Sequence, residues 1–121
     1  MAKTKIFEQF QSGGTAAFLI TDNQDIDIGF DGDLKDAVEG ATQTVSITKL
    51  HWTTSGSIQI DDGTTNFTLS GNGAWCQFNG WTPVDISNDI AVTITGTGSL
   101  FIEIKKLAGY KHRNDYSNAA I

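Results

Sequence analysis

The chain of 121 residues is long enough for one domain that buries roughly two thirds of its unfolded surface. Its formal net charge of −6 argues against a nucleic-acid-binding module, whose surface is basic. The single cysteine excludes an internal disulfide and suits a reducing compartment. We expect no signal peptide, synthesis in the cytoplasm and no membrane partner, because no stretch approaches the roughly 20 apolar residues of a membrane span.

Alternation of apolar and polar residues predicts three strands in the N-terminal quarter. The first, KIFEQF, places Ile6 and Phe10 on one face and Phe7 on the other. The second, AAFLI, is almost fully apolar, as a central strand is. The third, DIDIGF, turns its apolar residues, Phe30 among them, to one face and its acidic residues to the other. These strands are predicted at residues 5–10, 16–20 and 25–30.

One short helix is predicted near residues 33–39, in the segment DLKDAVEG. Asp33 is placed to cap its N-terminus, with Asp36 three residues later as a capping-box partner. Gly40 is placed to end it. The apolar residues Leu34, Ala37 and Val38 would share one face.

Strands resume after the helix. The segment TVSITKLHW carries apolar residues at both odd and even positions. Either the buried face changes along the strand, or both faces of the strand are covered. DDGTT between SIQI and NFTLS predicts a hairpin with Gly63 at positive φ, and TGTG between DIAVTI and SLFIEIKK predicts a second. AWCQF follows a turn at GNG. These strands are predicted at residues 44–52, 57–60, 66–70, 74–78, 89–94 and 99–106.

Many short strands with close turn signals predict an all-β fold, a jelly-roll-like β-sandwich, with a small β-barrel as the alternative. We place a single sandwich domain at residues 1–106 and an extended C-terminal tail at 107–121. Charge is segregated: residues 22–39 hold seven acids and one base, and residues 105–113 hold four bases and no acid. Such patches would steer a tail onto a neighbouring copy, or are simply solvated.

The segment LSGNGAWCQFNGW, residues 69–81, holds the only cysteine. A catalytic thiol needs a base, and the only histidines are His51, in a strand, and His112, in the polar tail. We therefore expect Cys76 to face the core and name no catalytic residue. Trp75 and Trp81 take the other parity, where they pack in the core or between subunits, or form a ligand-facing platform for a sugar.

No metal or cofactor is expected. An EF-hand reading from Asp25 fails because Gly29 and Phe30 occupy the fifth and sixth positions. A weak cation site within residues 25–36, using Asp31 and Asp33, stays open as an alternative. Zinc-ligand spacing and nucleotide-binding glycine loops are both missing from the sequence.

The order of these segments over residues 45–106, with the motifs HW, NFTLSGNGAW and DIAVTITGTGSLFIEIKK, resembles the small β-rich virion proteins of tailed bacteriophages. The resemblance implies a non-enzymatic structural protein in the virion, most simply a head decoration (cement) protein on the major capsid lattice. The alternative is a tail or fibre component with a glycan- or receptor-binding face. Either role implies other virion proteins as partners and a homo-oligomer.

The two ends of the chain carry aromatic and basic residues that the domain's own pattern does not bury. We therefore expect them to contact partner proteins. The expected contact residues are Phe7, Phe10, Tyr110, His112, Arg113 and Tyr116.

Overall fold

The computed structural model describes residues 3–76 and 86–112. Within these residues the chain is all β, with nine strands and no helix. The strands are β1 (Lys3–Glu8), β2 (Thr15–Ile20), β3 (Gln24–Ile26), β4 (Val45–Thr54), β5 (Ser57–Asp61), β6 (Asn66–Leu69), β7 (Asn72–Cys76), β8 (Ile90–Thr95) and β9 (Gly98–Lys106).

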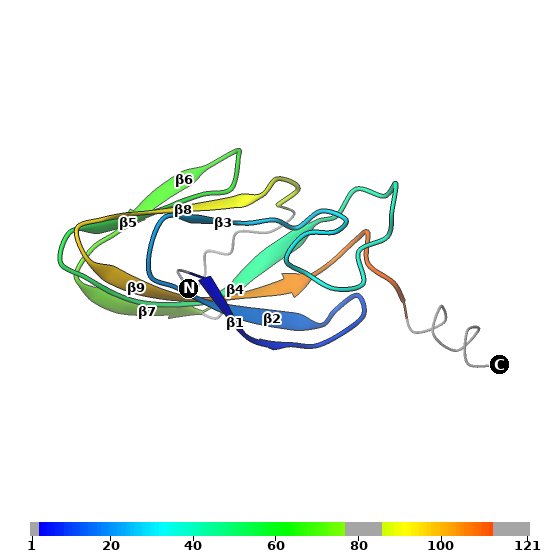
Figure 1. Ribbon diagram of the computed structural model, residues 1–121, viewed down its shortest axis with the longest axis horizontal. Coiled ribbons are helices and arrows are strands. Elements are labelled where there is room, and N and C mark those ends of the chain that lie inside the picture. Colours follow the sequence, from blue (N-terminus) through cyan, green and yellow to red (C-terminus); the bar gives the residue numbers. More distant parts are fainter. Residues whose placement is uncertain (1–2, 77–85, 113–121) are drawn as a thin grey trace.

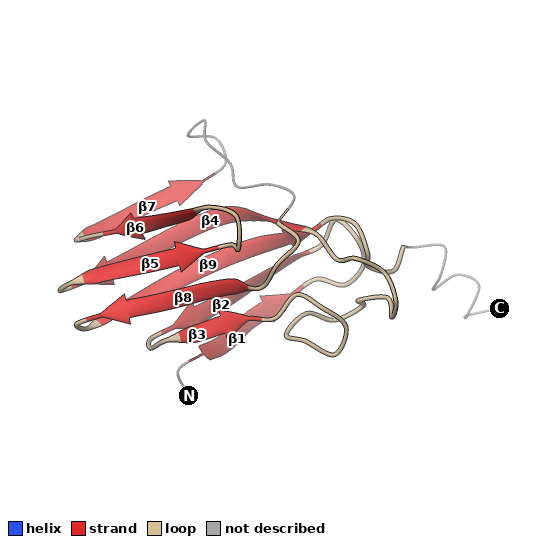
Figure 2. Ribbon diagram, turned by 90° about the horizontal axis from the view of Figure 1, so that it is seen from above, coloured by secondary structure: helices blue, strands red, loops and turns tan. Residues whose placement is uncertain are grey.

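Two antiparallel sheets face each other as a sandwich (Figure 1). One has the order β1-β2-β9-β4-β7 and the other β3-β8-β5-β6 (Figure 2). From β2 onward the pairing is nested, because β2 pairs with β9, β3 with β8, β4 with β7 and β5 with β6. This is the strand order of a jelly roll, with β1 added at one edge. The sheets remain separate, so the barrel alternative is wrong.

The core lies between the sheets and is built from alternate residues of their strands. One row across the larger sheet shows the pattern: Phe18, Ile102, Leu50 and Trp75 are cross-strand neighbours on the core side. The first three are almost fully buried. The smaller sheet contributes Ile26, Ile58, Ile60, Ile90 and Val92.

The predicted hairpin around Gly63 is confirmed, with Gly63 at φ +89°. The predicted β8–β9 hairpin is wrong, because the tight turn at Gly96 carries the chain from one sheet to the other. The apolar residues of β8 and β9 therefore meet across the core rather than side by side. Turn residues indicate that the chain reverses. They occur both in hairpins within one sheet and in connections between the two sheets.

The helix expected near residues 33–39 is not formed. Asp36 has φ +69°, which no α-helix accommodates, and Ala37 forms an isolated bridge with Tyr110. The expected capping residue, Asp33, instead accepts hydrogen bonds from the Asp27 amide (2.7 Å) and the Lys3 ammonium (2.8 Å). The local helical signal is outweighed by these contacts with other parts of the chain.

Two strand details also differ from the expectation. β3 ends at Ile26, and although Ile28 is buried, Phe30 is 46% exposed rather than on the core face. β4 contains a register shift between Ile47 and Lys49, opposite β9. This bulge changes the alternation within β4, which is why both of its parities carry apolar residues.

Candidate functional site

A buried lysine side chain links the ends of strands β9 and β1. Lys106, at the end of β9, is 0% exposed, and its Nζ lies 2.6 Å from Glu8 Oε2 at the end of β1. The same Nζ donates to the Gln9 carbonyl (2.9 Å). It also lies 5.9 Å from the Phe10 ring and 5.8 Å from the Tyr110 ring, within the range of cation–π attraction.

Backbone bonds hold the loop after β1 against the residues after β9. The Ser12 amide donates to the Lys111 carbonyl and the Gly13 amide to the Lys106 carbonyl, both at 2.8 Å. The Ser12 hydroxyl donates to the Leu107 carbonyl at 2.5 Å. Segments almost a hundred residues apart in sequence therefore form one continuous surface.

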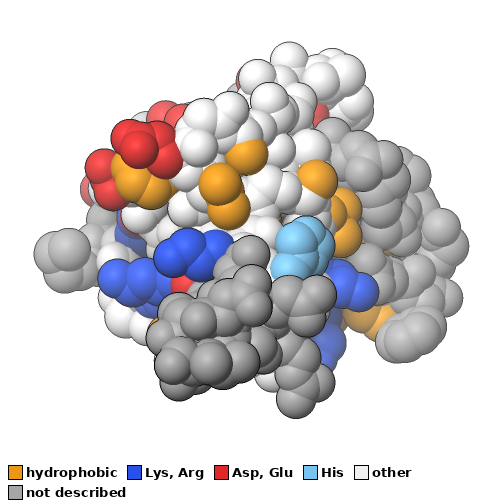
Figure 3. All heavy atoms as spheres, turned by 90° about the vertical axis from the view of Figure 1, so that its right-hand side faces the viewer, with side chains coloured by type: hydrophobic (Ala, Val, Ile, Leu, Met, Phe, Trp, Pro, Cys, Tyr) orange, Lys and Arg blue, Asp and Glu red, His pale blue; other side chains and the backbone are white. Residues whose placement is uncertain are grey.

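Three of the six exposed large hydrophobic side chains of the described residues come from this part of the chain. Phe10 is 61% exposed, Ile6 50% and Phe7 40%, and the basic residues Lys111 and His112 are exposed in the segment that bonds to Ser12. We call these five residues the terminal surface. Figure 3 looks onto this end of the molecule and shows basic side chains spread across it, with acidic ones gathered toward one edge.

The expected partner-contact residues thus divide into three groups. Phe7, Phe10 and His112 are exposed on the terminal surface. Tyr110 is 1% exposed, so its assignment to a partner contact is corrected: its ring belongs to this chain's own core. Arg113 and Tyr116 lie outside the described residues, as does Trp81.

Tyr110 is held by a specific bond. Its hydroxyl donates to the Ile28 carbonyl at 2.9 Å in a fully buried position. Burial, with smaller contributions from the charges of Glu8 and Asp27, raises the pKa of Tyr110 well above its ordinary value. Residues 107–112 are therefore part of the folded unit rather than the start of a free tail.

Glu8 is the anionic centre beneath the terminal surface. Burial acts to raise the pKa of Glu8, but bonds from Lys106, Lys5 and the Lys35 amide outweigh it and hold the pKa below its ordinary value. These bonds measure 2.6, 2.6 and 2.5 Å. Glu8 therefore stays ionised and fixes three segments of the chain at one point.

The acidic and basic segments meet within one chain. The Val38 amide donates to the Gly109 carbonyl (2.9 Å), and the Lys111 amide donates to the Asp36 carbonyl (2.8 Å).

Burial raises the pKa of Asp89, and the neighbouring charges of Asp27 and Asp25 add to that effect. Within residues 3–76 and 86–112, no group of three or more His, Cys, Asp or Glu side chains is placed to hold a metal ion.

The orientation of β7 is opposite to the expectation for Cys76. Trp75 pairs with buried Leu50 and packs against the core, whereas Cys76 pairs with exposed Lys49 on the outer face of the larger sheet. Periodicity alone could not assign the faces, because Trp and Cys are both common in cores. With Trp75 turned inward, the proposed sugar platform loses one of its two rings.

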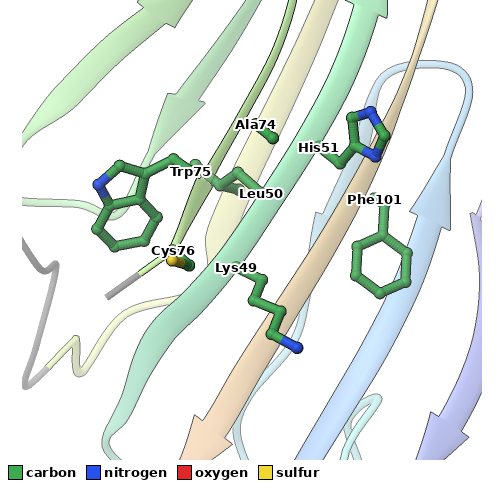
Figure 4. A pocket seen from close by; sticks show the side chains of 7 residues that line it. All are labelled: Lys49, Leu50, His51, Ala74, Trp75, Cys76 and Phe101. Atoms are coloured by element: carbon green, nitrogen blue, oxygen red, sulfur yellow. The ribbon is translucent and has the colours of Figure 1, made fainter. Parts of the chain in front are cut away.

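The outer face of the larger sheet carries an open groove of about 310 Å³, formed by residues of β4, β7 and β9. Figure 4 shows Lys49, His51 and Phe101 on one side of it and the Trp75 ring directed away from them. No hydrogen bond joins Cys76 to His51 or Lys49 within the described part of the chain. The geometry of an activated thiol is therefore not formed among these residues.

No protein-family model matches the chain, and no curated protein matches its sequence. The described residues contain no helix that is long and apolar enough to cross a membrane.

Proposed function

We propose that the chain is a non-enzymatic structural protein of a tailed-phage virion. In this role it is a capsid decoration protein that binds the major capsid lattice through the terminal surface. The observation that carries the proposal is the exposure of three apolar side chains within five residues, at Ile6, Phe7 and Phe10, in a segment that bonds to the one holding exposed Lys111 and His112. Exposed aromatic residues are enriched at protein-binding surfaces.

The terminal surface is also rigidly supported, which favours binding. Phe10 lies over the buried Lys106 ammonium, which is itself fixed by Glu8 and the Gln9 carbonyl. A binding surface that is already ordered loses little conformational entropy when its partner docks. An exposed apolar patch of this kind would also lower the solubility of a chain that had no partner.

The fold supports the proposal by analogy only. Jelly rolls occur in viral capsid proteins, in lectins and in cupins, so the architecture alone does not select one of these roles. A glycan-binding tail or fibre component was predicted from Trp75 and Trp81. Since Trp75 packs against the core, no described residue now favours that alternative.

The first test is the location and copy number of the protein in purified virions. We expect antibody raised against the chain to label heads in electron micrographs, and quantitative mass spectrometry to find it at a fixed ratio to the capsid protein. Absence from purified particles would overturn the proposal. Labelling of tails alone would overturn the capsid assignment.

The second test addresses the surface itself. Phe10→Ser removes the most exposed aromatic side chain of the terminal surface, and Phe30→Ser is a matched control on an exposed phenylalanine elsewhere. We expect at least a tenfold loss of affinity for undecorated capsids with Phe10→Ser and little change with Phe30→Ser. Equal affinities for both variants would contradict the role of the terminal surface.

A further inference from the structure

One stretch of this acidic chain carries no charge at all. Residues 63–84 contain no Asp, Glu, Lys, Arg or His, although the whole chain has a net charge of −6. Strands β6 and β7 both come from this stretch. They are edge strands of the two sheets and lie along the same side of the sandwich (Figure 2). This side is therefore an uncharged edge on a strongly acidic molecule.

The opposite side of the sandwich is protected against strand addition. Edge strand β1 has a register shift opposite β2, and Lys3, Lys5 and Glu8 lie on the core side of the sheet at that edge. Edge strand β3 has only three residues, one of them Asp25. Bulges, short strands and inward-pointing charges are the devices by which natural sheets prevent edge pairing. β7 has none of them, since its sequence is NGAWC and its pairing with β4 is regular.

The backbone of β7 offers hydrogen-bonding groups to a further strand. The Thr54 amide donates to the Gly71 carbonyl at 3.0 Å, which makes this a hydrogen-bonded pair of the β4–β7 ladder. Such pairs alternate along an antiparallel ladder. The backbone groups of Asn72, Ala74 and Cys76 therefore point away from β4, toward an edge at which no other described strand pairs.

The core is also less completely covered on this side. Trp52, Phe67, Leu69 and Trp75 pack against the core but remain half-buried. They come from β4, β6 and β7. Covering them would add apolar burial to any association along this side, at about 25 cal/mol per Å² of apolar surface removed from water.

We propose that a second copy of this chain pairs antiparallel with β7 about a twofold axis at Ala74, so that the two larger sheets become continuous. In this register Ala74 lies opposite Ala74 of the second copy, and Asn72 lies opposite Cys76. Each of these residues then makes two backbone hydrogen bonds, one through its N–H and one through its C=O, with the residue opposite it. Small or neutral side chains at these positions leave room for close approach.

The occupant is a second copy for two reasons. The outer edge of β7 is self-complementary in this register, as an isologous twofold contact requires. Two copies with a charge of −6 repel each other elsewhere, and the uncharged side is where they meet without opposing like charges. Paired β7 strands alone fall short of the roughly 1,200 Å² of a stable interface, so the neighbouring β6 side must contribute area as well.

The test is the association state of the purified full chain, measured by sedimentation equilibrium across a concentration series. We expect a monomer–dimer equilibrium that Ala74→Lys shifts at least tenfold toward monomer, because it places two like charges face to face. The exposed Thr4→Lys on β1 is the matched control and should leave the equilibrium unchanged. A chain that is monomeric at every concentration, or a dimer that Ala74→Lys does not weaken, would overturn the proposal.

A cross-link fixes the register independently of protein stability. In a Cys76→Ser background, Ala74→Cys should form a disulfide-linked dimer on mild oxidation, because hydrogen-bonded antiparallel neighbours have Cα atoms about 5.5 Å apart. Thr4→Cys in the same background should remain unlinked. Equal cross-linking of both variants would reject β7 as the contact. Dimerisation along β7 and binding to a capsid are separate events, so the failure of one leaves the other in place.

Discussion

Lys106 Nζ lies 2.6 Å from Glu8 Oε2, so an ion pair with a fully buried cation ties β9 to β1. Removing the carboxylate would leave a charge with no water around it. We expect Glu8→Ala to lower the free energy of unfolding by about 3–5 kcal/mol. The double variant Glu8→Ala/Lys106→Met should recover much of that loss, because it removes both charges and keeps the apolar volume. Urea denaturation measures both, and a double variant no more stable than Glu8→Ala would contradict the role of the ion pair.

The same pair predicts a pH dependence. Because the folded pKa of Glu8 lies below the ordinary 4.5, its contribution to stability is complete above that pH. It is lost as the pH falls through the folded value. We expect the wild-type free energy of unfolding to decrease more steeply below pH 4.5 than that of Glu8→Gln, measured by denaturant titration at a series of pH values. Parallel curves for the two proteins would contradict the assignment.

Truncation should show how much the residues just after β9 contribute to stability. Ending the chain after Leu107 removes Tyr110, a fully buried aromatic residue, and should cost about 3–5 kcal/mol. Ending it after His112 keeps Tyr110 and the Lys111 carbonyl that bonds to Ser12, so this truncation should be the more stable of the two. Thermal unfolding followed by circular dichroism compares the two. Equal stability of both truncations would show that the Tyr110 contacts contribute little.

The Tyr110 hydroxyl has its own predicted effect. Tyr110→Phe keeps the ring but leaves the Ile28 carbonyl without its 2.9 Å donor. An unsatisfied buried acceptor costs about 1–3 kcal/mol, so the variant should fold but unfold at lower denaturant concentration. An unchanged midpoint would mean that another donor replaces the hydroxyl.

Gly73 is expected to be intolerant of a side chain. A Cβ at this position would collide with the Trp52 ring, whose indole N–H donates to the Ser70 carbonyl at 3.1 Å. We expect Gly73→Ala to cost about 1–3 kcal/mol through overpacking. Gly29→Ala is the control, because its new Cβ would make an ordinary 3.4 Å contact with the Asp27 side chain. Similar unfolding midpoints for the two variants would contradict the close packing at Gly73.

Much of the fold was predictable because strands and turns are encoded locally. AAFLI reads as an interior strand and is one, and Gly63 supplies the positive φ of its hairpin. The helix near residues 33–39 was mispredicted because its residues bond to distant segments, as Asp36 Oδ2 does when it accepts the Gln11 amide. Local propensity is outweighed by such contacts. The prediction of a β8–β9 hairpin failed for a related reason. Turn residues do not specify which strand will pair with the one that follows the turn.

The candidate site was predictable only in part. The exposed aromatics of the terminal surface, Phe7 and Phe10, were singled out in the sequence, and both are exposed. Tyr110 was misassigned because a polar, non-alternating segment gives no sign that one of its rings inserts into a core. The buried Lys106 was missed altogether, since its position at a strand end made it look like an ordinary solvated lysine. Lys106 is buried only because the ends of β1 and β9 come together in the folded structure.

The position of β9 has a consequence for how the protein is made. β9 is the last of the described strands but lies in the interior of its sheet, between β2 and β4. On a ribosome, therefore, β2 can pair only with β1, and β4 only with β7, until β9 has been made. Long-range pairing of this kind is slow and leaves unpaired edges open to aggregation in the interval. We expect nascent chains that stop short of residue 98 to depend on chaperones, and the sandwich to form only once β9 has emerged.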